Sequence, residues 1–81
     1  MTAQSKNPMD LNLASHHCRL LADPTRLRLL LLLDREELSV AELAGITQLA
    51  QPRVSTHLAK LKESGLVTVR RDGVFVYYRI T

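Results

Sequence analysis

Apolar residues recur every three to four positions over residues 10–64 of this 81-residue chain, and every second position over residues 66–80. The first period is that of an α-helix and the second that of a β-strand. The change falls at Gly65, which we expect to end the last helix in a left-handed conformation. Residues 1–9 are polar, show neither period and are predicted to form a flexible arm. The pattern therefore predicts one domain, residues 10–81, with a helical part followed by strands.

Local start signals divide the helical part into four helices. The first begins at Asp10. The second begins at Pro24, because proline suits the first helical position and the preceding Asp23 can accept backbone N–H bonds. Ser39 and Glu42 form a capping box, which predicts a third, short helix just after Ser39. The fourth begins near Ala50.

The leucine-rich second helix is predicted to be the centre of the core. Its inner stripe is expected to be Leu27, Leu30 and Leu31, widened by Leu29, Leu32 and Leu33.

The first helix is apolar on two sides. One side, which includes Cys18 and Leu21, is expected to face the core, where a free cysteine behaves as a small apolar residue. The opposite side carries Leu13, His17 and Leu20 and is expected to contact a second subunit.

Two β-branched and aromatic runs near the C-terminus are separated by Asp-Gly at 72–73, which predicts a hairpin. With those two residues as the loop, Val69 faces Val76 and Val67 faces Tyr78. On the other face, we interpret the aromatic residues at 75 and 77 as packing within the sheet rather than as stacking on bases. Four helices and a hairpin predict a mainly α fold with a two-stranded wing, the winged helix-turn-helix.

The exposed face of the fourth helix carries polar side chains that are mostly short, as a helix that enters a DNA major groove requires. Gln51 and Arg53 can bond base edges, Ser55 and Thr56 let the backbone approach, and Lys60 is expected to meet a phosphate. His57 lies at the margin of the buried stripe and is predicted to be packed or hydrogen-bonded.

Positive charge is concentrated in the C-terminal part of the chain. Residues 1–52 hold five Lys and Arg against six Asp and Glu, whereas residues 53–81 hold six against two. At the hairpin tip, Arg70 and Arg71 are expected to reach phosphates or the minor groove. This distribution favours a polyanionic partner.

Composition narrows the classes of protein to which the chain could belong. A single cysteine cannot form an internal disulfide and suits a reducing compartment, and no apolar run approaches the ~20 residues of a membrane span. We therefore expect a cytoplasmic protein. No nucleophile is paired with a base and no carboxylate pair falls in a predicted cleft, so no catalytic role is expected.

Four motifs, "LADPTRLRLLLLL", "ELSVAELA", "AQPRVSTHLAKLKESGLV" and "RRDGVFVYYRI", occur in an order that resembles the ArsR/SmtB family of winged-helix repressors. The resemblance implies a homodimeric repressor on a palindromic operator, relieved by a metal, metalloid or redox signal. It also implies DNA contacts at Gln51, Pro52, Ser55 and Thr56, and at the wing tip from Arg70 through Gly73.

The sequence departs from that family at Pro52 and Ala50, where serines are common, and two further departures matter more. Ser39 and Ala41 stand where metal-sensing members have cysteines, so neither the soft-metal site nor any other metal or cofactor is expected. His16, His17 and Cys18 diverge around a helix and cannot converge on one ion by themselves. The family's final helix is also absent. Dimerisation then rests on the first helix, or the chain is a domain of something longer, for instance a methyltransferase fusion.

An alternative function stays open at this point: winged domains also serve as protein-interaction or tethering modules of larger proteins.

Overall fold

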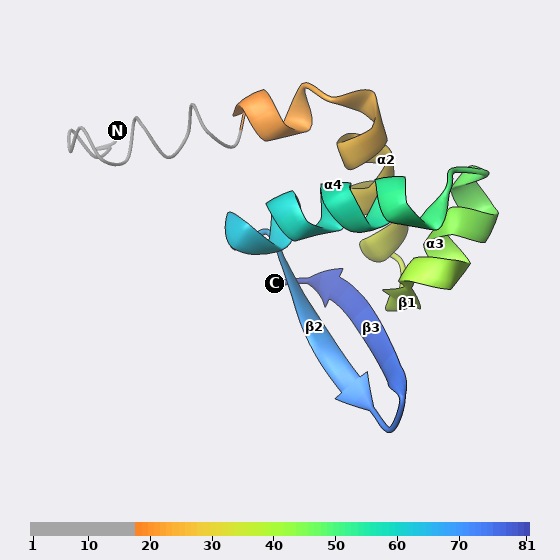
Figure 1. The fold of residues 1–81 in the computed structure, drawn as a ribbon. Coiled ribbons are helices and arrows are strands. Elements are labelled where there is room, and N and C mark those ends of the chain that lie inside the picture. The colour runs from red at the N-terminus through yellow and green to blue at the C-terminus, as the bar shows by residue number, and fades with distance from the viewer. Residues whose placement is uncertain (1–17) are drawn as a thin grey trace, which may run out of the picture.

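The computed structural model describes residues 18–81, and the expectations for the arm and for most of the first helix fall outside that range. The elements are α2 (Pro24–Leu33), β1 (Leu38–Ser39), α3 (Val40–Thr47), α4 (Gln51–Glu63), β2 (Val67–Asp72) and β3 (Phe75–Ile80). Figure 1 shows the helices gathered together, with the hairpin of β2 and β3 leaving the C-terminal end of α4 and pointing away from them. The predicted winged helix-turn-helix is confirmed.

Helix α2 begins where its cap was predicted. Asp23 Oδ1 accepts hydrogen bonds from the amides of Thr25 at 2.8 Å and Arg26 at 3.3 Å, and Pro24 occupies the first turn. Desolvation raises the pKa of the Asp23 carboxyl, but the two amide bonds, together with the charges of His57 and Arg26, outweigh that effect and lower the pKa.

This cap makes stability depend on pH. Because the folded-state pKa of Asp23 is lowered, its contribution is complete above the unfolded value of about 3.9 and is lost as pH falls through the folded-state pKa. Asp23→Ala should therefore lower Tm by several degrees at neutral pH, and by much less at about pH 2. Thermal unfolding followed by circular dichroism measures both differences. Asp23→Asn keeps a side-chain acceptor and should retain most of the stability; an equal loss in Asn and Ala would contradict this role.

The inner face of α2 differs from the predicted one. Leu29 and Leu33 are buried, whereas Leu27 is 43% and Leu31 60% exposed. Leu30, predicted in the inner stripe, is partly buried against the core. The predicted centre of the stripe was therefore wrong at Leu27 and Leu31, whereas Leu29 and Leu33, which were expected only to widen it, are its buried centre. Helix α2 is rotated so that these two residues face α4 and the sheet.

Strand β1 turns the predicted hairpin into a sheet of three strands in the order β1-β3-β2. Leu38 pairs with Tyr78 and Ser39 with Tyr77, both antiparallel. Ser39 also caps α3: its hydroxyl accepts from the Glu42 amide at 3.1 Å while Glu42 Oε1 accepts from the Ser39 amide at 2.9 Å. The capping box is thus confirmed, and β1 anchors the base of the hairpin beside α3.

The hairpin pairs in a register two residues away from the predicted one. Val67 lies opposite Ile80 and Val69 opposite Tyr78, so the predicted pairs Val69–Val76 and Val67–Tyr78 were wrong. The loop is residues 73–74, with a φ of 62° at Gly73. A Gly-X loop requires a positive φ only at the glycine, whereas the predicted Asp-Gly loop would strain the aspartate as well. A two-residue shift keeps each side chain on its expected face.

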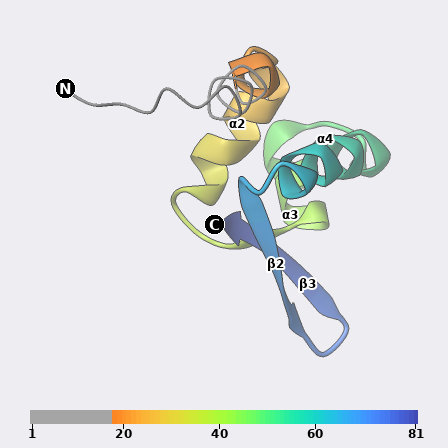
Figure 2. The same cartoon turned by 90° about the vertical axis from the view of Figure 1, so that its left-hand side faces the viewer.

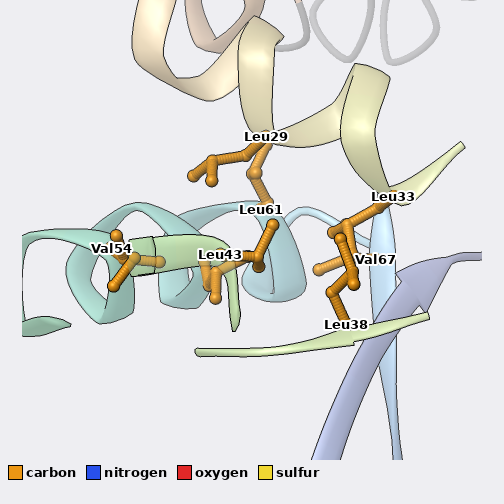
Figure 3. Packing of buried hydrophobic residues seen from close by; sticks show 9 residues of the cluster. Leu29, Leu33, Leu38, Leu43, Val54, Leu61 and Val67 are labelled. Atoms are coloured by element: carbon orange, nitrogen blue, oxygen red, sulfur yellow. The ribbon is translucent and has the colours of Figure 1, made fainter. Parts of the chain in front are cut away.

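The core lies where α2, α3, α4 and the base of the sheet meet (Figure 3). Its fully buried side chains come from three helices: Leu29, Leu43, Val54, Leu58 and Leu61. Val67 of β2 and Leu38 of β1 close it from the sheet side. The same core therefore fixes α4 against both the other helices and the hairpin.

The described end of the first helix exposes a different side from the one predicted. Cys18 is exposed and Leu21 is 37% exposed, whereas Leu20 is only 5% exposed. The core position predicted for Cys18, and the exposed dimer-contact position predicted for Leu20, are corrected accordingly. The other predicted dimer contacts, Leu13 and His17, lie outside the described residues.

Candidate nucleic-acid interface

Helix α4 is held by one side and exposed on the other. Val54, Leu58 and Leu61 are fully buried, and half-buried His57 borders them. The Nε of Arg26 in α2 donates to Nδ1 of His57 at 3.3 Å, so the predicted hydrogen-bonded histidine is confirmed. Three apolar anchors and one bond to α2 give the helix a fixed orientation, which a surface that reads another molecule requires.

Most of the residues predicted to contact DNA lie away from the buried side of α4, and Gln51 lies at the start of the helix. All of them are exposed: Gln51, Pro52, Arg53, Ser55, Thr56 and Lys60. The Thr56 hydroxyl donates to the Pro52 carbonyl at 2.9 Å, which fixes the rotamer and leaves the oxygen free to accept. The helix starts at Gln51 with Pro52 in its first turn, and Ala50 supplies no side-chain cap. The amides of Arg53 and Val54 donate to the Ala50 carbonyl at 3.0 and 3.1 Å, so the first turn is closed by backbone bonds alone.

A tight connection presents this end of α4. Helix α3 ends at Thr47 and is capped by Gln48, which has a φ of 64° and whose side-chain amide donates to the Gly45 carbonyl at 2.8 Å. Only residues 48–50 separate α3 from α4, the short turn of a helix-turn-helix. In Figure 2, α4 lies beside α3, with the hairpin extending beyond both helices.

The hairpin carries the second cationic group. We call β2, β3 and the loop at 73–74 the wing. Arg70 and Arg71 are both exposed, but as neighbours on a strand they point to opposite faces. Gly73 lies at the tip, where Val74 is 90% exposed. The tip is thus accessible to a partner, and the two arginines lie on opposite faces of the wing.

Arg70 is engaged within the chain. Its Nε donates to both carboxylate oxygens of Glu37, at 2.9 and 3.2 Å, and its guanidinium lies 4.9 Å from the centre of the Tyr77 ring. The hydrogen bond to Glu37, and then the Glu37 charge, raise the pKa of Arg70. Phe75 stacks on Tyr77 with 6.3 Å between ring centres, in agreement with the packing role predicted for both aromatics.

Sequence reasoning missed Glu37. Glu37 is the first residue of the motif "ELSVAELA", but the sequence gives no sign that its carboxylate contacts an arginine of the hairpin. Only the pairing of β1 with β3 brings Glu37 beside Arg70.

Within residues 18–81, no three His, Cys, Asp or Glu side chains are grouped so that they could hold a metal ion. The same part of the chain contains no helix of the length and apolar character that crossing a bilayer demands.

Comparison with known families finds a match to the family described as "Bacterial regulatory protein, arsR family" over residues 23–69. The arsenic resistance transcriptional regulator ArsR1 of Pseudomonas putida is 52% identical over 61 residues, which cover 74% of this chain and 48% of that protein. The arsenical resistance operon repressor of Escherichia coli is 45% identical, over 78% of this chain and 55% of the repressor. The chain thus spans about half the length of these curated relatives.

Solved structures agree with the fold. Reduced HlyU from Vibrio cholerae superposes with a TM-score of 0.84 at 34% identity, over 91% of this chain and 78% of that one. A homodimeric winged helix-turn-helix DNA-binding domain of a possible ArsR-family transcriptional regulator from Mycobacterium bovis gives a TM-score of 0.84 at 36% identity. That alignment covers 99% of this chain and 75% of the other.

Proposed function

This chain belongs to the arsR family of bacterial regulatory proteins, and on that premise we propose that it is a sequence-specific, double-stranded DNA-binding transcriptional regulator. It acts as a repressor, and it binds a palindromic operator as a homodimer in the cytoplasm, where bacterial DNA resides. In this proposal the chain binds DNA and catalyses no reaction. The homodimeric neighbour supports the dimer, as do Leu21, Leu27 and Leu31, whose apolar side chains are exposed in the single chain.

One observation carries the proposal: the polar, exposed side of α4 is presented by a helix whose other side is fully buried. Gln51 and Arg53 at its start can form hydrogen bonds with base edges. The side chains of Pro52, Ser55 and Thr56 are small, so the helix backbone can come close to the bases. In this proposal Lys60 and the wing, which carries Arg70, Arg71 and Gly73, flank the groove on the side of the phosphates. A protein-docking helix would instead present exposed apolar anchors on this side.

The proposal predicts salt-dependent and sequence-dependent binding. A duplex of about 30 base pairs, long enough for two half-sites one turn apart, is recovered by selecting random-sequence DNA with the wild-type chain. Below we call it the selected duplex. Fluorescence anisotropy should show log affinity falling against log salt with a slope of about −3 to −4, as expected for two phosphate contacts per subunit of a dimer.

The control for that titration is a scrambled duplex of the same composition, which should bind about a thousandfold more weakly. Equal affinity for both duplexes, or no binding at low salt, would contradict the proposed function. The absence of binding would favour the tethering alternative.

A further inference from the structure

Two adjacent arginines of β2 stand in different electrostatic surroundings. Arg71 shares a face of the sheet with Val67, the residue that packs into the core beside α4. Arg71 is exposed, and within residues 18–81 its guanidinium makes no side-chain hydrogen bond or ion pair. Arg70 points to the other face of the sheet, toward Glu37. The two cations therefore cannot have equal access to the same DNA backbone.

A small network holds Arg70 on that face. Besides the bonds at 2.9 and 3.2 Å to Glu37, its guanidinium lies 3.8 Å from an Asp72 carboxylate oxygen and against the Tyr77 ring. Glu37 also lies 3.9 Å from Arg79 Nε on β3. The Glu37 side chain is 30% exposed, less than that of either arginine. Glu37 thus joins the segment that precedes β1 to both strands of the wing.

This arrangement constrains how the wing can work. An isolated exposed ion pair contributes little, but several charges and a ring that share one guanidinium hold it better than a single pair does. If Arg70 moved to a phosphate, it would leave the Glu37 carboxylate with only the longer contact to Arg79. Arg71 can bind a phosphate without breaking any of these contacts.

We propose that Glu37 is a positioning residue of the DNA-binding surface. It holds Arg70 on the face of the wing that carries Tyr77, so that Arg71, on the other face, supplies the wing's phosphate contact. The inference rests on the proposed function and divides the roles of the two arginines. Arg70 orients the wing, and Arg71 binds.

The slope of log affinity against log salt separates these roles, because it counts neutralised phosphates and does not depend on the fraction of active protein. On the selected duplex, Arg71→Gln should make the slope shallower by about 0.9 per subunit. Arg70→Gln should leave the slope unchanged and weaken binding by about two- to fivefold, the range that exposed ion pairs contribute.

Glu36→Gln is the matched control for Glu37→Gln, because it removes the same charge from the neighbouring, exposed position. Glu37→Gln should bind about two- to fivefold more weakly than Glu36→Gln, and this difference should vanish when Arg70→Gln is also present. A shallower slope for Arg70→Gln, or tighter binding by Glu37→Gln than by Glu36→Gln, would overturn the inference. In both cases the wild-type chain still binds, whereas failure of the wild type to bind would overturn the proposed function itself.

Discussion

Leu58→Ala is expected to destabilise the domain by about 2–5 kcal/mol, because it opens a cavity where α4 meets the rest of the core. Leu58 is fully buried on the side of α4 opposite its polar face. An 81-residue domain has a total stability of roughly 4–12 kcal/mol, so this loss is a large share of it. Urea unfolding followed by circular dichroism measures the change in the free energy of unfolding.

The matched control is Leu31→Ala, the same change at a leucine of α2 that is 60% exposed. Because Leu31 is also among the leucines proposed for the dimer contact, both variants are unfolded at a protein concentration low enough for the chain to be monomeric. There Leu31→Ala should alter the free energy of unfolding by no more than about 0.5 kcal/mol. Comparable losses for the two variants would contradict the observed rotation of α2 and favour the stripe that helical periodicity alone suggested.

Arg53→Ala is expected to reduce discrimination between the selected and scrambled duplexes by about 1–3 kcal/mol, because an arginine fork on a guanine edge is lost. Arg53 lies in the first turn of α4 and is exposed, and within residues 18–81 its side chain makes no hydrogen bond or ion pair. Competition anisotropy with the two duplexes measures the ratio of their affinities directly.

Lys60→Ala provides the contrast. Lys60 lies near the C-terminal end of α4, and its proposed contact is a phosphate. Its removal should weaken binding to both duplexes equally and make the salt slope shallower by about 0.9 per subunit. A variant of Arg53 that weakens both duplexes by the same factor would show that this arginine also contacts only the backbone.

The sequence predicted those parts of the fold that local chemistry determines. Asp23 and Ser39 cap their helices through bonds within three residues, and Gly65 takes a φ of 84° directly after α4. The buried stripe of α4 followed from Val54, Leu58 and Leu61, because all the residues between them except Ala59 are polar and the contrast is strong.

The parts that were missed depend on tertiary contacts. Residues 29–33 are all leucine, so periodicity cannot distinguish the buried positions from the exposed ones, and packing on α4 and the sheet decided. Strand β1 has two residues, too few for an alternating pattern, and it exists because Leu38 pairs with Tyr78. The contact of Glu37 with Arg70 spans 33 positions and follows from that pairing.

For the candidate site, helical geometry predicted which positions of α4 are exposed. It could not predict that Arg70 and Arg71 have different surroundings in the wing. Neighbours on a strand alternate in side, and only the three-stranded sheet shows which side carries Glu37.

The central claim is that the start of α4 enters the major groove of duplex DNA. Methylation protection with dimethyl sulfate on the selected duplex tests it most directly, because the N7 atom of guanine is exposed in that groove. We predict two clusters of protected guanines about 10 base pairs apart, weakened in Arg53→Ala but retained in Lys60→Ala at saturating protein. Full reactivity of every guanine in a saturated complex would contradict the account.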